Sequence, residues 1–309
     1  MSALRIEWNK QNQKDWQVRL KQVGSYTAYQ QDWSYGEAAR QFGGQVQRAA
    51  ILKDDECVGL VQLTARTLMR YAKVVMAMRG PVWIDELSDE DKAQAYRLLR
   101  KELEVKWPKL TLWMPESDDH DALRQAKMRK IISGYSTVMI DLDQSQDDLL
   151  KAQDGKWRNR LKAAQKGDVK IHNVGLRLQQ YAWLLEAEAR QSAIRRYAAL
   201  PPDFVPIYQM GAGKESLLIL RAEINKVTVA GVLILLHANS ATYHIGWSND
   251  EGRQSGAHNL LLWEAMSKLK SKGIRWFDLG GVNTEDAAGI ARFKLGMGGQ
   301  VMSLSGTYN

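Results

Sequence analysis

The sequence predicts an α/β protein of two tandem domains, each a mixed β-sheet flanked by helices. Its 309 residues exceed what one hydrophobic core usually fills. Stretches with strand-like alternation of apolar and polar residues follow stretches with helical spacing. The run CVGLVQL at Cys57–Leu63 returns as VAGVLIL at Val229–Leu235, each time after a polar hairpin turn. Repetition of this kind indicates an internal duplication, and therefore two similar domains.

The first half carries a hairpin, a third strand, and helices that alternate with further strands. A helix is expected to begin at Asp32 or Ser34, because either side chain can cap a helix start. The later elements are expected as strands at 46–52, 58–64 and 73–78, a long helix at 89–107, a strand at 110–114, a helix at 121–130 and a strand at 137–142. We assign residues 1–148 to this first domain.

The second half repeats this order within residues 149–309, after a linker expected in the Asp- and Gln-rich stretch 143–154. Prolines 201, 202 and 206 indicate a loop after the long helix. The expected elements are a basic helix at 156–166, a strand at 169–174, a long helix at 178–196, and strands at 217–221, 227–237 and from Ala241 onward.

The last third of the chain is the most informative stretch. Tyr243 and Trp247 share one face of a strand that ends in the polar residues 248–250. Ser255 is expected to cap the next helix, which Gly273 ends. A second strand at 274–279 then leads into a pair of glycines. Two strands, a helix and a glycine-lined turn form a place where a ligand could contact the backbone.

Composition narrows the classes of partner and chemistry. The formal net charge of +8 favours a polyanion: RNA, a phosphorylated precursor or an anionic membrane surface. Cys57 is the only cysteine, and the five histidines show no metal-ligand spacing, so no metal or other cofactor is expected. His244 and His258 could be polar contacts in the C-terminal block, or packed or solvated side chains. Residues 1–20 offer no apolar stretch of the kind found in signal peptides, and a cytoplasmic location is expected.

The C-terminal motifs resemble those of the FemABX aminoacyltransferases, which move an amino acid from aminoacyl-tRNA onto the peptide stem of a peptidoglycan precursor. The resemblance is carried by the order and spacing of Tyr243, Gly246 to Asn249, Trp263-Glu264, FDLGG at Phe277–Gly281, Gly289, Phe293-Lys294 and Gly298-Gly299. It implies two acetyltransferase-like (GNAT) domains in tandem, which agrees with the duplication. It also implies that residues 301–308 return to complete the first domain.

The resemblance assigns roles to particular residues. Lys294, after Phe293, aligns with a lysine that stabilises the transition state on the aminoacyl-tRNA side. The acceptor is expected at Tyr243, Trp247, Ser248 and Asn249, although the two aromatic rings could simply pack. Asp278 is expected either to orient the amine or to hydrogen-bond the turn. The acceptor's pyrophosphate needs cations, for which Arg196, preferred to Arg195, and Arg40 are the candidates.

The basic helix resembles the segment that opens the family's second domain. Lys156, Arg158, Lys162 and Lys166 are its candidate tRNA contacts, and the last three share a face by their four-residue spacing. A solvated helix face is the ordinary alternative.

The resemblance therefore implies aminoacyl-tRNA as donor and a lipid-linked or UDP-linked muropeptide as acceptor. A peripheral contact with the anionic inner face of the membrane is a further expectation. The sequence leaves open the amino acid, the kind of acceptor, and whether the acceptor is peptidoglycan at all. One alternative is an acyl-CoA donor held by Arg253–His258, which half-matches the acetyltransferase pyrophosphate loop. Another is a noncatalytic relative that binds RNA or the precursor.

Overall fold

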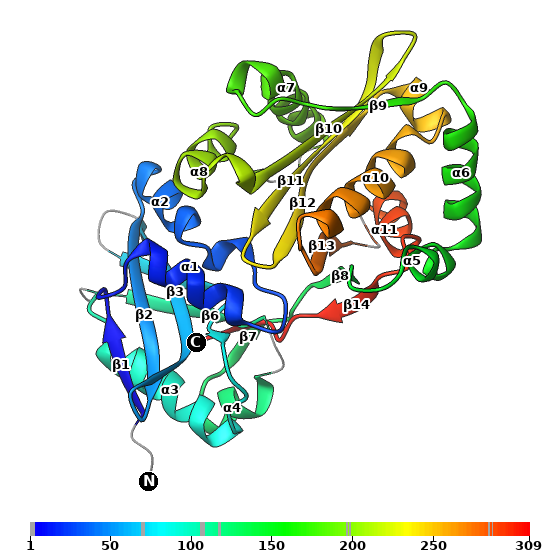
Figure 1. The fold of residues 1–309 in the computed structure, drawn as a ribbon. Helices are drawn as coiled ribbons and strands as arrows, with labels where there is room; N and C mark the ends of the chain where they lie inside the picture. Colours follow the sequence, from blue (N-terminus) through cyan, green and yellow to red (C-terminus); the bar gives the residue numbers. More distant parts are fainter. Residues whose placement is uncertain are drawn as a thin grey trace. The chain divides into compact units, whose positions relative to one another are not determined.

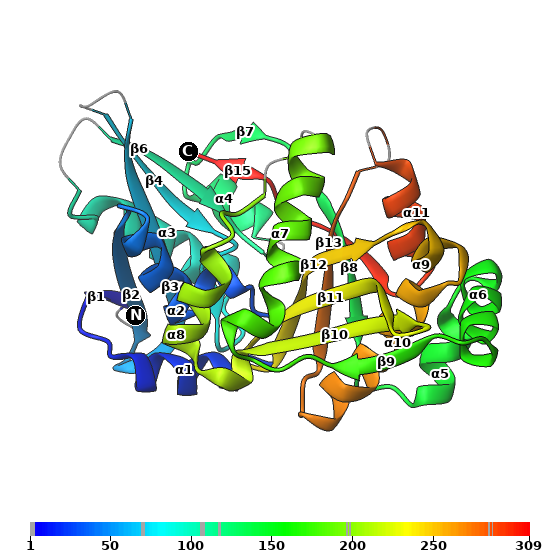
Figure 2. The same ribbon diagram turned by 90° about the horizontal axis from the view of Figure 1, so that it is seen from above.

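The computed structural model describes residues 4–68, 72–105, 109–116, 119–195, 197, 199–283, 285 and 287–309. The chain divides into two compact units, one made of Met1–Tyr135 with Ser303–Asn309 and the other of Ser136–Met302. Each unit is built around one mixed sheet with helices against it (Figures 1 and 2). Among the described residues, no helix is both long and apolar enough to span a bilayer.

The sheet of the first unit has the strand order β1-β2-β3-β4-β6-β15-β7, and β5 pairs with β3. Its strands are β1 (Leu4–Trp8), β2 (Gln45–Lys53), β3 (Glu56–Leu68), β4 (Ala72–Met78), β5 (Val82–Trp83), β6 (Lys109–Met114), β7 (Lys130–Ile132) and β15 (Thr307–Tyr308). Its helices are α1 (Gln13–Gln22), α2 (Trp33–Gln41), α3 (Asp89–Glu102) and α4 (His120–Gln125), with a 3₁₀ turn at Tyr29–Gln31. Strands β4 and β6 are parallel and are connected through α3.

Aromatic side chains fill the core of this unit. The Tyr96 ring lies between those of Trp83 and Trp113, with edge contacts at centroid distances of 6.0 and 5.8 Å. The buried Asp119 carboxylate accepts hydrogen bonds from the Trp83 indole, the Tyr96 hydroxyl and the Lys92 ammonium. Because each of these polar groups is paired, the core tolerates a buried charge.

The sheet of the second unit has the order β14-β8-β13-β12-β11-β10-β9. Its strands are β8 (Ser136–Asp141), β9 (Lys170–Asn173), β10 (Leu217–Ile224), β11 (Val227–His237), β12 (Ser240–Ser248), β13 (Trp276–Val282) and β14 (Gln300–Ser303). Its helices are α5 (Gln146–Ala152), α6 (Gly155–Lys166), α7 (Leu178–Arg195), α8 (Phe204–Ala212), α9 (Asp250–Gln254), α10 (Ala257–Ser271) and α11 (Ala288–Leu295), with a 3₁₀ turn at Lys214–Ser216. Strands β12 and β13 are parallel and are connected through α9 and α10.

The predicted duplication is present in the two sheets. The antiparallel pair β2–β3 in the first unit corresponds to β10–β11 in the second, and in both units a third strand, a helix and a parallel strand follow. The repeated glycine of each half lies against a tryptophan. A Cβ added at Gly59 would lie 2.9 Å from the Trp83 ring, and one at Gly231 would lie 2.5 Å from the Trp183 ring. Glycine is needed at both places because a side chain would displace the indole.

The structure differs from the sequence expectations at several boundaries. Strand β8 pairs with β13, so residues from 136 onward belong to the second unit, whereas the expected division lay after residue 148. The expected linker contains α5, whose start is capped by the Ser145 hydroxyl. The proline-rich loop continues into α8. The helices expected at 89–107 and 121–130 end at Glu102 and Gln125, and residues 106–108 lie outside the described part of the chain.

The C-terminal segment divides between the two sheets. Strand β14 lies beside β8 in the second sheet, and β15 pairs with β6 and β7 in the first. Backbone hydrogen bonds between Asn309 and Arg129 hold the end of the chain in the first unit.

Candidate active site

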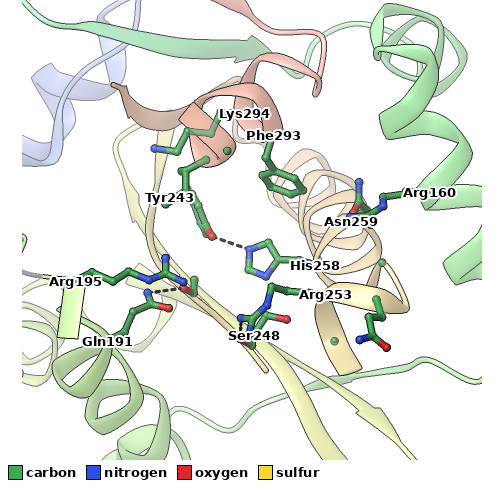
Figure 3. A pocket seen from close by; sticks show the side chains of 16 residues that line it. Arg160, Gln191, Arg195, Tyr243, Ser248, Arg253, His258, Asn259, Phe293 and Lys294 are labelled. Atoms are coloured by element: carbon green, nitrogen blue, oxygen red, sulfur yellow. Dashed lines mark hydrogen bonds between the residues drawn. The ribbon is translucent and has the colours of Figure 1, made fainter. Parts of the chain in front are cut away.

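A cavity of 520 Å³ opens in the second unit where β12 faces α7, α10 and α11 (Figure 3). Strand β12 contributes Tyr243, and the first turn of α10 contributes His258. Helix α11 contributes Phe293 and Lys294, and α7 contributes Gln191 and Arg195 on the opposite side. The cavity is lined by Arg160, Gln191, Arg195, Tyr243, Gly246, Ser248, Gly252, Arg253, Gln254, Gly256, His258, Asn259, Gly289, Ile290, Phe293 and Lys294.

The FDLGG segment positions Lys294. The Lys294 ammonium donates a hydrogen bond to the Gly281 carbonyl at 2.8 Å. Gly280 adopts φ +77°, a left-handed conformation that glycine takes readily, and a Cβ there would lie 3.4 Å from the Lys294 nitrogen. Burial lowers the pKa of Lys294, and the charge of Asp278 acts in the opposite direction. The turn therefore holds a half-buried cation at the edge of the cavity.

Asp278 stabilises this turn. Its side chain is fully buried, and its carboxylate accepts hydrogen bonds from the Thr137 hydroxyl and, at 2.7 Å, from the Gly280 backbone amide. Asp278 was expected either to orient the amine or to hydrogen-bond the turn. Its contacts fit the second role, because a carboxylate that accepts from a backbone amide fixes the conformation of the turn.

Tyr243 and His258 form a hydrogen-bonded pair in the middle of the cavity. The Tyr243 hydroxyl lies 2.7 Å from His258 Nε2, and the Phe293 ring packs edge-on against the imidazole at a centroid distance of 5.5 Å. A Cβ at Gly246 would collide with the Tyr243 hydroxyl, so glycine at this position leaves room for the pair. Burial raises the pKa of Tyr243, with the charge of Glu188 as a smaller contribution. The Tyr243 hydroxyl therefore stays protonated at neutral pH.

Two histidines of the second unit are held neutral by burial. The pKa values of His244 and His258 are each lowered to about 4 by desolvation. His258 is the one at the cavity, whereas the His244 ring packs against Phe204 at a centroid distance of 5.7 Å. His258 is therefore a neutral hydrogen-bonding group at neutral pH.

These lowered pKa values predict a loss of stability in mild acid. Between pH 6.5 and pH 4 the unfolded chain binds protons at these two histidines that the folded chain does not, so the free energy of unfolding falls as the pH falls. We expect a decrease of about 2 kcal/mol between pH 7 and pH 5, after allowing for partial solvent exposure. Urea unfolding at the two pH values measures it. His244→Phe should reduce the difference, because it removes one of the two buried histidines.

The charge of the cavity is positive. Its described lining includes Lys294 and three arginines and contains no carboxylate. Arg195 lies at the end of α7, close to Gln191, and Arg160 approaches from α6 on the other side (Figure 3). Arg253 is held in place by the Ser248 carbonyl and by Asp250. A lining of this kind favours an anionic ligand.

The other residues expected to bind the acceptor lie in different settings. The Trp247 ring packs edge-on against Trp183 at 5.9 Å and does not line the cavity, which corresponds to the packing alternative. Ser248 lines the cavity, and its hydroxyl donates to the Val229 and Asn249 carbonyls. Asn249 caps α9 by accepting from the Gly252 amide at 2.8 Å. The cap expected at Ser255 was wrong, because Ser255 ends α9 and α10 begins after Gly256.

Of the two candidate pyrophosphate cations, one lies outside the described residues and the other belongs to the first unit. Arg196 lies outside the described residues, whereas its neighbour Arg195, the less favoured choice from sequence, lines the cavity. Arg40 lies in the last turn of α2 in the first unit, where its guanidinium pairs with Glu37 at 2.9 Å.

The expected tRNA stripe divides into groups with different roles. Lys162 and Lys166 are exposed on α6, and Lys156 is exposed at its start. Arg158 instead donates to the backbone carbonyls of Leu150, Lys151 and Gln153 at 3.2–3.3 Å. These are the unpaired carbonyls at the end of α5, so Arg158 acts as a cap for that helix.

This difference predicts separate effects of two substitutions. Arg158→Ala is expected to lower the free energy of unfolding by about 1–2 kcal/mol, because it leaves the α5 carbonyls without their charged donor. Lys162→Ala, at a solvated position, is expected to change it by less than about 0.5 kcal/mol. Urea unfolding of the two variants compares them directly. Equal stability of both would contradict the capping role.

Several cavity residues were not singled out from the sequence. Arg160 does not share the helix face of Arg158, Lys162 and Lys166. It shares a different face of the same helix with Lys156, because the two are four residues apart. Asn259, one residue after His258, is buried in the first turn of α10, and Trp157 is buried at the start of α6. The helical register of the apolar residues in α10 and α6 was the available signal, but it does not show which elements meet. Within the described part of the chain, no group of three acidic, histidine or cysteine side chains is arranged to hold a metal ion.

Comparison with known proteins gives the fold. Residues 153–295 match the acetyltransferase (GNAT) domain family. The whole chain superimposes on the crystal structure of FemX with a TM-score of 0.81 and 14% identity, covering 98% of this chain and 96% of FemX. A conserved protein of unknown function from Bacteroides thetaiotaomicron superimposes with a TM-score of 0.65 and 13% identity, over 98% of each chain.

A tandem GNAT protein from the clavulanic acid biosynthesis pathway superimposes less closely. Its TM-score is 0.54 at 11% identity, covering 99% of this chain and 98% of that protein. A search of the curated proteins found no significant match.

The two repeated sheets and the family match define a tandem fold of the GNAT kind, and residues 153–295 of the second unit match the acetyltransferase (GNAT) domain family. Within that class the chain is FemABX-like in fold, since FemX superimposes over nearly its full length.

Proposed function

We propose that this protein is an aminoacyltransferase that moves an amino acid from aminoacyl-tRNA to an amine of a peptidoglycan-precursor peptide stem or a related acceptor. The observation that carries the proposal is the cavity of the second unit, which has Lys294 at its edge, three arginines in its wall and no carboxylate in its described lining. Both substrates are anionic, and a wall of this charge attracts them. The likeness to FemX supports the choice of substrates.

The chemistry asks little of the protein beyond orientation and charge. The acceptor amine attacks the ester carbonyl, a C–N bond forms, and the C–O bond to the ribose breaks. One proton leaves the amine and one reaches the ribose oxygen. Holding the two substrates together supplies much of the rate. No covalent nucleophile is required, because the ester is already activated.

Lys294 stabilises the charge that develops on oxygen during this reaction. Its ammonium is half-buried and is oriented by the Gly281 carbonyl, so it is fixed before the substrate arrives. A preoriented cation in a partly dry site stabilises an oxyanion or a leaving ribose oxygen far more than a solvated one. Phe293 orients the imidazole of His258 at the same cavity.

The acceptor is proposed to lie along β12, α9 and α7. Tyr243, Ser248 and Arg195 line that side and offer hydroxyl groups and a guanidinium, which suit peptide carbonyls and phosphates. Asn249 shapes this side by capping α9, and Trp247 supports it by packing on Trp183. Lys156, Lys162 and Lys166 on α6 are proposed to contact tRNA.

An acyl-CoA-dependent N-acyltransferase is the second candidate, and one observation favours it. Arg253 and Gln254 at the end of α9 and Gly256 and His258 at the start of α10 line the same cavity, in the segment that half-matches the acetyltransferase pyrophosphate loop. The match to the acetyltransferase family covers this loop.

Transfer of radiolabel tests the two donors side by side. The protein is incubated with a mixed pool of labelled charged tRNA and a peptidoglycan-precursor extract, with labelled acetyl-CoA in a parallel reaction. Label moving from tRNA to the extract is the expected result. Label moving only from acetyl-CoA would refute the aminoacyl-tRNA donor and favour the second candidate.

A further inference from the structure

A second cavity, of 830 Å³, adjoins the first on the side of α6 and α11. It is lined by Asp154, Lys156, Trp157, Arg160, Asn259, Ala288, Gly289, Ala291, Arg292, Phe293, Leu295 and Gly296. Arg160, Asn259, Gly289 and Phe293 line both cavities, so the two share a wall. In Figure 3, Arg160 and Asn259 lie together at this wall, on the side away from Arg195.

Two buried donors on residues that line the second cavity have no hydrogen-bond partner among the described residues. They are the Trp157 indole N–H, on a side chain that is 5% exposed, and the Asn259 amide nitrogen, on a side chain that is 3% exposed. An unpaired buried donor costs about 1–3 kcal/mol, and nearly all such groups in folded proteins are paired. Two of them on residues that line one cavity are donors available to a ligand that accepts hydrogen bonds.

The charge of the second cavity identifies the kind of acceptor. Lys156, Arg160 and Arg292 line it, and Asp154 is the one carboxylate in the described lining. The Asp154 carboxylate caps α6 by accepting from the Lys156 and Trp157 backbone amides, so it is already engaged. Three cations with two neutral donors match a group that carries negative charge and several acceptor oxygens, as a phosphate does.

We infer that the cavity between α6 and α11 binds a phosphate group of the acyl donor, with Trp157, Asn259, Lys156, Arg160 and Arg292 as its contacts. This rests on the proposed function, in which the first cavity holds the acyl group. Phe293 and Asn259 line both cavities. A donor whose phosphate is bound in the second cavity therefore extends past these two residues, and its acyl group lies in the first cavity next to Lys294. The phosphate is a phosphodiester in RNA and a pyrophosphate or monoester in coenzyme A.

Binding of short probes tests the site without requiring transfer. A single-stranded RNA oligonucleotide, coenzyme A and inorganic phosphate are titrated against the full chain at several salt concentrations. Lys156→Ala and Arg292→Ala are each expected to weaken RNA binding about 3- to 10-fold and to lower the salt slope by about one. Asn259→Leu removes the buried donor. The matched control is Lys170→Ala, which removes an exposed lysine of β9 that lines neither cavity.

The outcomes distinguish the existence of the phosphate site from the identity of the donor. RNA binding that the cavity variants weaken and Lys170→Ala does not supports the inference as stated. Coenzyme A binding that depends on the same residues, without RNA binding, supports the phosphate site and refutes the tRNA donor. Binding of every probe unchanged by Lys156→Ala and Arg292→Ala would overturn the site, even if Asn259→Leu failed to fold. Absence of transfer with the binding pattern intact would count against the proposed function alone.

Discussion

Lys294→Met is expected to slow acyl transfer about 100- to 1,000-fold, because it removes one preoriented cation from the developing oxyanion. Methionine keeps much of the length of the side chain and its packing on α11 but carries no charge and no donor. The loss should fall on kcat more than on KM, since the contact strengthens in the transition state. Single-turnover transfer from charged tRNA measures it.

A matched lysine distinguishes the site from general charge. Lys170→Ala removes one positive charge from the same unit outside both cavities and is expected to transfer at the wild-type rate. Unchanged turnover in Lys294→Met would remove Lys294 from the mechanism. Absence of turnover in the wild-type protein with either donor would favour a binding role for the whole chain.

Gly246→Ala is expected to break the Tyr243–His258 pair. The added methyl collides with the Tyr243 hydroxyl, so the tyrosine ring must move and His258 loses its hydrogen-bond partner. We expect the free energy of unfolding to fall by about 1–3 kcal/mol. Because the cavity changes shape next to Lys294, transfer is expected to slow about 10- to 100-fold.

Thermal unfolding and nitrogen NMR of the His258 ring measure the two effects of Gly246→Ala. Tyr243→Phe removes the same hydrogen bond without the collision and should give the same change in the His258 signal. Gly155→Ala is the matched glycine control, because a Cβ there meets nothing within 4 Å at the start of α6. A His258 signal that Gly246→Ala leaves unchanged would show that the cavity accommodates the methyl group.

The parts of the fold that depend on local pattern were predictable. The hairpins, the long helices and the duplication follow from side-chain alternation, helical spacing and the CVGLVQL and VAGVLIL runs, and the structure confirms them. Strand β8 was placed in the wrong half because its alternation shows only that it is a strand. Its pairing with β13, more than 130 residues later, is a non-local choice that periodicity does not report.

The same distinction between local patterns and non-local contacts applies to the candidate site. Lys294 and the FDLGG segment could be singled out because their motifs resemble those of the FemABX family, and the structure places the Lys294 ammonium on the Gly281 carbonyl of that segment. Arg160, Trp157 and Asn259 could not, because their meeting depends on how α6 packs against α10. Arg158 was assigned to RNA from its charge and face, but the end of α5, which lies before it in sequence, takes its guanidinium.

The most direct test of the central proposal maps where the acylated end of the donor binds. An RNA 3′ end joined through a stable amide to a photoreactive amino acid is crosslinked to the full chain, and the adducts are located by mass spectrometry. The proposed function predicts adducts at Tyr243, Phe293 or other residues of the first cavity, suppressed by charged tRNA. Adducts confined to the first unit, or adducts that charged tRNA does not suppress, would contradict it.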